Sequence, residues 1–80
     1  MTREEVLERL EDVFEDVLEI DDDDVTEELS QDTCEEWDSL AQITLLVSVE
    51  NEFGVKFTAD EMASMKSVAK IIDAVLAKKA

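Results

Sequence analysis

The N-terminal part of the chain carries apolar residues at three- and four-residue spacing, which is typical of one face of a helix. Thr2 and Glu5 form a capping-box sequence ahead of this run. We therefore expect a helix that begins there and ends near Glu19 or Ile20. Acidic side chains occupy the opposite face. The expected apolar face consists of Val6, Leu7, Leu10, Val13, Phe14, Val17 and Leu18.

A second helix is expected from Ser39 to Phe53, followed by Gly54 as a left-handed C-terminal cap. Its apolar residues cover more than one stripe, which favours a central helix that is contacted on several sides. This set consists of Leu40, Ala41, Ile43, Leu45, Leu46, Val47, Val49 and Phe53.

Between these helices the sequence lacks sustained periodicity, so a long first loop is expected to begin at Asp21. Val25 and Leu29 are available to pin this loop to the core. The acidic run that ends at Asp24 resembles a calcium-binding loop, but an EF-hand needs a glycine at its sixth position. The sole glycine of the chain is Gly54. A solvated loop that attracts cations weakly is therefore favoured over a calcium sensor.

Two further helices are expected in the C-terminal part of the chain. Thr58 and Glu61 form a second capping box, which opens a helix of one to two turns carrying Met62 and Met65. Ser67 can cap a closing helix. Its apolar stripe consists of Val68, Ile71, Ile72, Val75 and Leu76.

The predicted fold is all-α: a single domain over residues 1–80, with three longer helices, one short helix and a long first loop. The 80 residues are 45% hydrophobic, with no proline and one glycine, which argues against an all-β chain. One cysteine and no histidine exclude an intrachain disulfide and a thiolate zinc site. No run is apolar enough for a secretion signal or a bilayer span, so we expect a cytoplasmic monomer.

The charge is strongly negative and unevenly distributed. The 23 acidic and 7 basic residues give a formal charge of -16. Residues 1–38 contain 18 acids and two bases, whereas residues 39–80 contain five of each. The charge therefore argues against binding to nucleic acid or to an anionic membrane, and basic protein partners are expected. One hypothesis is an acidic binding adaptor without a prosthetic group.

Ser39 is the candidate for chemistry. It can cap the second helix with Gln42 as a capping box, although Asp38 is an equally good cap. A catalytic serine is excluded because the chain has no histidine to act as its base. A phosphate-containing group on Ser39 would lie at the positive end of the helix. Trp37 is interpreted as a packing anchor, and Cys34 as an inert thiol among acids.

The run Trp37-Asp38-Ser39-Leu40, together with Val49-Glu50-Asn51-Glu52-Phe53-Gly54-Val55 after it, resembles the acyl carrier proteins over essentially the whole chain. The resemblance implies a four-helix carrier without catalytic activity. It implies 4′-phosphopantetheine on Ser39, transferred from coenzyme A by a phosphopantetheinyl transferase that uses magnesium. Asp38 would cap the helix and help to organise that metal. The carrier would take acyl thioesters between enzymes of fatty-acid, polyketide or related biosynthesis.

The resemblance also implies a docking surface and a cavity. Basic patches on acyl-loading and acyl-transferring enzymes would dock at Glu35 and Glu36, and their apolar groups at Leu40 and Ile43. A further five residues fall where the family lines a cavity for the acyl chain: Val47, Phe53, Phe57, Met62 and Met65. The positions after the serine that are often acidic in the family are uncharged here: Ala41, Gln42 and Thr44. This difference suggests a specialised stand-alone carrier whose docking charge comes from the preceding loop, including Asp32.

Overall fold

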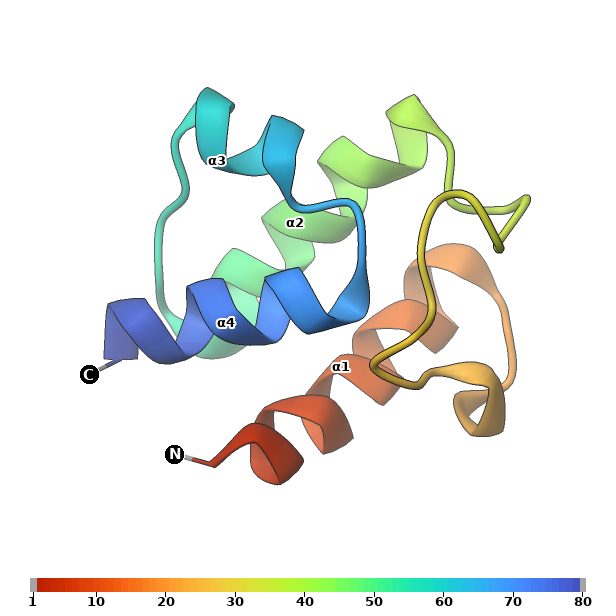
Figure 1. Cartoon of the computed structure of the whole chain (residues 1–80), viewed down its shortest axis with the longest axis horizontal. Helices are drawn as coiled ribbons and strands as arrows, with labels where there is room; N and C mark the ends of the chain where they lie inside the picture. Colours follow the sequence, from red (N-terminus) through yellow and green to blue (C-terminus); the bar gives the residue numbers. More distant parts are fainter. Residues whose placement is uncertain (1, 80) are drawn as a thin grey trace.

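The computed structural model describes residues 2–79, which form a bundle of four α-helices and one 3-10 turn (Figure 1). The elements in chain order are α1 (Arg3–Leu18), η1 (Asp22–Asp24), α2 (Ser39–Phe53), α3 (Ala59–Ser64) and α4 (Val68–Lys79). Within these residues the strand-like pairing is limited to one isolated bridge between Ser30 and Ser67. The predicted all-α architecture with one short helix is confirmed.

The starts of α1 and α3 and the ends of α1 and α2 lie where the sequence predicts them, because local hydrogen bonds fix them. Helix α3 ends at Ser64, so Met65, which is expected on this helix, is instead its C-cap. Thr2 accepts a hydrogen bond from the backbone N–H of Glu5 and completes a capping box at α1. Thr58 does the same for α3. Helix α1 closes on Glu19 in the left-handed conformation, and α2 closes on Gly54 with φ +67°. Glycine adopts this conformation without steric penalty, so the predicted cap is confirmed.

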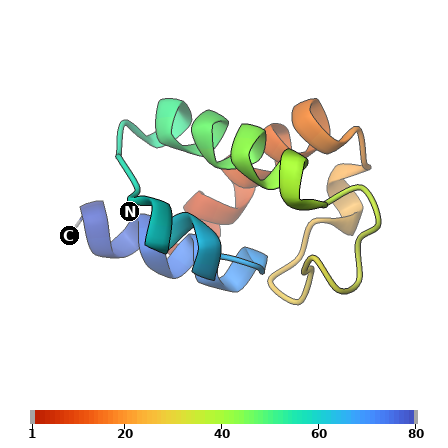
Figure 2. The ribbon, with the colours of Figure 1, turned by 90° about the horizontal axis from the view of Figure 1, so that it is seen from above.

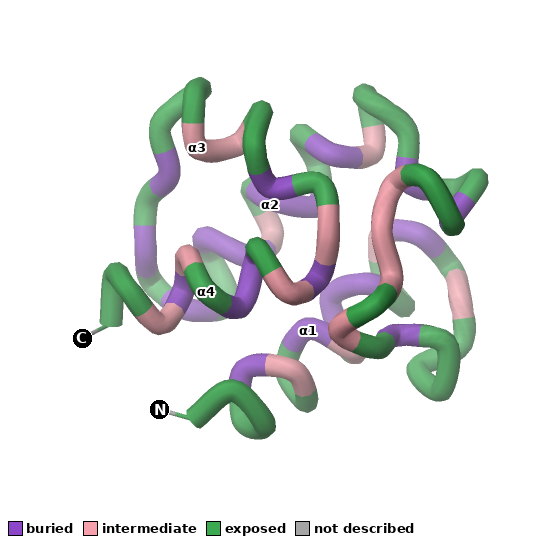
Figure 3. The backbone as a smooth tube through the Cα atoms, viewed as in Figure 1, coloured by how far each residue is buried: buried purple, intermediate pink, exposed green. Residues whose placement is uncertain are grey.

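Helix α1 packs against both α2 and α4, and α3 lies on α2 (Figures 1 and 2). The buried faces of α1, α2 and α4 turn toward one another, as the purple segments of Figure 3 show. Trp37 joins this core and is 1% exposed. Its ring meets that of Phe14 edge-on, with 5.1 Å between the centroids. The expected role of Trp37 as a packing anchor is confirmed.

The wide apolar set of α2 has a different explanation from the predicted one. The helix is not contacted all round, because Leu40, Ile43 and Val47 are 80%, 58% and 43% exposed. Their spacing of three and four residues places them on one face, opposite to the buried Leu45 and Val49. Helix α2 therefore has a core face and a separate apolar face toward solvent.

The long first loop is fixed to the rest of the molecule at two places. Val25 is 3% exposed and enters the core, and Leu29 packs against it, as expected. Beyond this anchor, the N–H of Gln31 donates to the carbonyl of Lys66 (3.0 Å), and the N–H of Val68 donates to the carbonyl of Leu29 (2.9 Å). The loop is thereby bonded to the junction of α3 and α4.

The start of α1 and the end of α4 lie at one end of the bundle, and α2 begins at the other (Figures 1 and 2). At the start of α1, Arg3 forms ion pairs with Glu27 of the loop and Asp73 of α4. Over residues 2–79 no helix combines the length and the apolar character that crossing a bilayer requires.

Candidate functional site

Ser39 is the first residue of α2 and is exposed to solvent. Asp38 precedes it as the N-cap, and its Oδ1 accepts a hydrogen bond from the N–H of Ala41 at 2.8 Å. Of the two predicted caps, Asp38 is therefore the one used. The alternative capping box between Ser39 and Gln42 is not formed, because the side chain of Gln42 points into the core. The hydroxyl of Ser39 is thus not required to cap the N-terminus of α2.

The first turn of α2 is a suitable place for an anion next to Ser39. Its N–H groups point out of the helix end, and the helix dipole makes this end partly positive. The first turn itself contains no acidic residue. A phosphate ester on Ser39 could therefore be stabilised by the backbone of α2.

A groove of about 520 Å³ lies beside Ser39, between the first turns of α2 and helix α3. Its lining is mostly apolar. The residues that line it are Ser39, Gln42, Ile43, Ala59, Met62, Ala63 and Lys66. A long, thin and partly apolar group attached at Ser39 could lie against this groove. The first turn of α2 therefore fits the phosphate of a phosphopantetheine arm, and the groove fits its pantetheine chain.

The predicted docking residues lie around the same end of α2. Leu40 and Ile43 belong to the exposed apolar face, and Glu35 and Glu36 are exposed in the turn before the helix. The acids of α2 itself are confined to its last turns, where Glu50 is 9% exposed and Glu52 pairs with Arg9 at 3.7 Å. The acidic turn and the apolar helix face are therefore separate neighbouring surfaces.

The structure does not gather the five predicted cavity residues around one cavity. Phe53, Phe57 and Met65 are packed in the core with 3%, 9% and 3% of their surface exposed. Met62 is half-buried and lines the groove. Val47 is on the exposed face of α2, which corrects its expected place, because it follows Leu40 by seven residues and so shares its helical face.

Gln42 has a role in the site that the sequence analysis, which names it only as a capping-box partner and as an uncharged position, does not predict. It is 7% exposed, and its Oε1 accepts a hydrogen bond from Nε1 of Trp37 at 2.5 Å. Its Nε2 donates to the carbonyls of Met62 (2.7 Å) and Met65 (2.6 Å). One amide thus connects the loop, α2 and α3. Its position on the same face as Leu45 was the available signal, since a residue three positions away shares that face.

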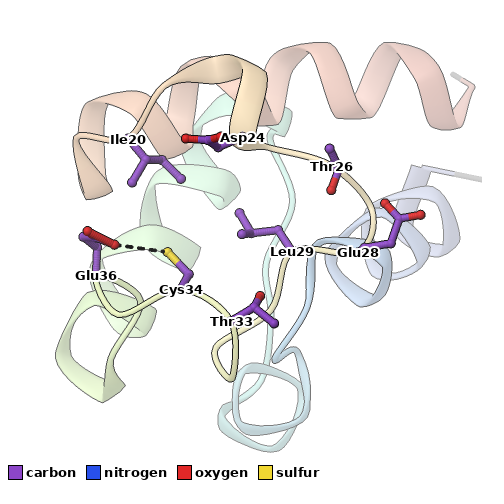
Figure 4. Close-up of a pocket in the computed structure, with 8 residues that line it drawn as sticks. All are labelled: Ile20, Asp24, Thr26, Glu28, Leu29, Thr33, Cys34 and Glu36. Carbon is purple, nitrogen blue, oxygen red and sulfur yellow. Dashed lines mark hydrogen bonds between the residues drawn. The ribbon is translucent and has the colours of Figure 1, made fainter.

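A second pocket of about 430 Å³ lies under the first loop (Figure 4). Cys34 faces it, is 7% exposed and donates to Oε1 of Glu36 at 3.7 Å. Burial raises the pKa of the Cys34 thiol, and the charge of the nearby Glu36 acts in the same direction. The thiol therefore stays protonated at neutral pH, which agrees with the prediction that Cys34 is unreactive. Within the part of the chain that the structure describes, no three cysteine or carboxylate side chains converge as metal ligands.

An exposed serine at the start of a helix, beside an apolar groove in a small four-helix bundle, is the arrangement of a carrier domain whose covalent arm is attached to that serine. The family described as "Phosphopantetheine attachment site" matches residues 8–75. The acyl carrier protein of Petrotoga mobilis is 32% identical over 73 residues, which are 91% of this chain and 86% of that protein. The acyl carrier protein of Rubrobacter xylanophilus is also 32% identical, over 95% of this chain and 94% of that protein.

A solved acyl carrier protein from Enterococcus faecalis has the same fold, with a TM-score of 0.76 and 26% identity. The match covers 98% of this chain and 99% of that one. The chain belongs to the acyl carrier protein family. It is a carrier of acyl groups in biosynthesis, and 4′-phosphopantetheine is its prosthetic group. Members of this family work with phosphopantetheinyl transferases and with biosynthetic enzymes.

Proposed function

We propose that Ser39 is the residue that carries 4′-phosphopantetheine, and that the chain is a single cytoplasmic carrier domain without catalytic activity of its own. The observation that carries this proposal is the exposure of Ser39 directly after its capping neighbour Asp38. When attached, the group supplies a thiol that holds acyl groups as thioesters. The protein residues keep the attachment point accessible, stabilise the phosphate at the start of α2 and offer the groove to the arm.

Asp38 has a double role in this proposal. Its carboxylate caps α2 through the N–H of Ala41 and so fixes the position of Ser39. As an exposed carboxylate next to the modified hydroxyl, it also helps the transferase to position magnesium.

Partner enzymes would recognise two surfaces on either side of Ser39. Glu35 and Glu36 attract a basic patch on the partner, and Leu40 and Ile43 insert into an apolar part of it. The early turns of α2 lack exposed acids, which suits a specialised set of partners rather than a general fatty-acid synthase.

The direct test is incubation with coenzyme A, magnesium and a broad-specificity phosphopantetheinyl transferase, followed by intact-mass measurement. One pantetheinyl adduct is expected on the native chain and none on Ser39→Ala. Thr44→Ala, which removes an exposed hydroxyl from the same helix, should retain the adduct. An unmodified native chain, or an adduct that persists in Ser39→Ala, would refute the assignment. Salt-dependent binding of an unmodified chain to a basic protein would then favour the acidic adaptor.

A further inference from the structure

Lys66 is a charged residue near Ser39 to which the attachment of the prosthetic group gives no role. It belongs to the junction between α3 and α4, and it lines the same groove as Ser39. Among the described residues that line this groove, Lys66 is the only charged one. Its side chain is exposed, and none of the ion pairs formed by residues 2–79 includes it. The charge of Lys66 is therefore available to a group attached at Ser39.

The main chain at Lys66 is fixed from two sides, which keeps its side chain at the groove. Its carbonyl accepts a hydrogen bond from the N–H of Gln31 in the first loop at 3.0 Å, and its N–H donates to the carbonyl of Ser64 at 3.1 Å. The carbonyl of Met65, directly before it, accepts from Nε2 of Gln42 at 2.6 Å. Only the flexible four-carbon stem of Lys66 is therefore free to move its ammonium group.

A phosphate group on Ser39 would enter a surface that is already acidic. Glu35, Glu36 and Asp38 precede Ser39 within four residues and are exposed. A phosphodiester adds a further negative charge there, and like charges at such short separations repel one another. The N–H groups at the start of α2 balance this charge only in part, because a helix end carries about half an elementary charge. A positive side chain nearby would complete the balance.

We propose that Lys66 is a binding residue for the prosthetic group: its ammonium group pairs with the phosphodiester on Ser39 and offsets the repulsion from the acids before it. The inference rests on the proposed attachment at Ser39. Because the phosphate is bonded directly to Oγ of Ser39, the pairing does not depend on the direction that the rest of the arm takes. Lysine suits this role, since its ammonium group has three donors and a mobile stem.

The side-chain ammonium signals of the native chain test this pairing without any substitution. The holo chain is prepared with coenzyme A, magnesium and the transferase, and intact mass shows that modification is complete. The ¹⁵N NMR signal of the Lys66 ammonium group is expected to shift on modification, whereas that of Lys79, at the end of α4, should stay in place. Lys66→Arg removes the signal and so assigns it. An unchanged Lys66 signal would overturn the proposal.

The energetic test compares the change in Tm on modification between the native chain and its variants. Lys66→Gln removes the proposed counter-ion, and Lys79→Gln makes the same change of net charge at the exposed end of α4. At low salt, modification should lower the Tm of Lys66→Gln by about 2–4 °C more than that of the native chain or of Lys79→Gln. Equal changes in the native chain and in Lys66→Gln would overturn the proposal.

Two controls separate charge from packing. Lys66→Arg keeps the positive charge, so its change in Tm on modification should match that of the native chain. At about 1 M salt, where the Debye length is about 3 Å, the difference between Lys66→Gln and the native chain should disappear. A difference that persists at this salt concentration would overturn the ion pair.

The two proposals fail in different ways. If the mass measurement finds no adduct at Ser39, the attachment site is wrong, and the inference about Lys66 is overturned with it. If the adduct forms at Ser39 but neither the Lys66 signal nor the change in Tm depends on it as expected, only the inference about Lys66 is overturned.

Discussion

At the scale of single residues, Asp38 has one observed role, as a helix cap, and one proposed role, in organising magnesium, and a conservative substitution can separate them. As the N-cap of α2 it needs only a side-chain oxygen that accepts from Ala41, and asparagine can supply one. As a partner for magnesium in the transferase complex it needs a negative charge, which asparagine lacks. The cap and the charge can therefore be tested independently.

We expect Asp38→Asn to keep the stability of the native chain while slowing pantetheinylation by about tenfold or more, since the metal would lose a charged ligand. Asp38→Ala should show the same slowing and also lose about 1 kcal/mol of stability with the cap. Urea unfolding and a mass-based time course measure the two effects. A normal modification rate for Asp38→Asn would disprove the role in metal organisation.

The site positions that the sequence predicts are those that depend on neighbours in the chain, whereas the attachment role of Ser39 comes from the resemblance to the family. Asp38 and Ser39 could be placed because a helix start is fixed by the four or five residues around it. Gln42 could not, because its partners Met62 and Met65 are 20 and 23 residues away. The family resemblance places Val47 in a cavity, but the packing of α2 leaves it on the exposed face, and this packing depends on residues far away in the chain.

At the scale of elements, Glu50 organises the chain after α2. Its backbone carbonyl accepts from the N–H groups of Gly54 (2.8 Å) and Val55 (3.1 Å), which closes the helix. Its Oε2 accepts from the buried N–H of Phe57 at 2.7 Å. One residue thus ends the helix and holds the connection to α3, and so positions one wall of the groove.

The variant Glu50→Ala should be destabilised by about 1–3 kcal/mol, because the buried N–H of Phe57 would lose its acceptor. Glu50→Gln keeps an oxygen at the same place and should retain most of the stability. Chemical denaturation of both variants gives the comparison. A similar loss for the two would mean that the carboxylate charge, and not the hydrogen bond, is the stabilising feature.

The boundaries of the helices could be predicted, whereas the way in which the loop is held could not. Thr2, Thr58 and Gly54 act on their own turns, so their sequence context is sufficient. The hydrogen bonds from Gln31 and Val68 join segments far apart in the chain and involve only backbone atoms, for which no side-chain pattern exists.

At the scale of the whole molecule, the excess of acid sets the dependence of stability on pH. Burial raises the pKa of Glu11, and the nearby charges of Asp22 and Glu8 raise it further. The carboxylate of Glu11 therefore binds a proton more tightly in the folded chain than in the unfolded chain. Stability increases as the pH falls toward 4.5, the ordinary pKa of a glutamate. The hydrogen bond from Thr58 and the contact with Lys78 lower the pKa of Glu61. The ionised carboxylate of Glu61 therefore stabilises the folded chain at neutral pH, and this stabilisation is lost only as the pH falls below 4.5.

We expect the Tm of the native chain to rise between pH 7 and pH 4.5, and the variant Glu11→Gln to have a higher Tm at pH 7 with a smaller rise. Differential scanning calorimetry across this range measures both. Glu61→Gln should instead lower the Tm at pH 7, and its difference from the native chain should shrink only below pH 4.5, in scans extended to that range. A Tm that falls steadily on acidification from pH 7 would contradict this picture.

Charge reversal at the turn before α2 should act on encounter with partners more than on folding. The double variant Glu35→Lys and Glu36→Lys is expected to reduce the association rate with the transferase by about tenfold at low salt. The control carries Glu8→Lys and Asp12→Lys, the same change of charge on the exposed face of α1. Stopped-flow binding measures both, and equal rates for the two double variants would argue against docking at Glu35 and Glu36.

The position of the two helix ends, at the far side of the bundle from Ser39, has a practical consequence (Figures 1 and 2). A tag, a surface linker or an entire fused enzyme could be joined at the start of α1 or the end of α4 without shielding the hydroxyl of Ser39. The carrier can therefore be immobilised by either end while the modifying enzyme reaches it from solution, which makes it suitable for single-molecule recording of successive loading events.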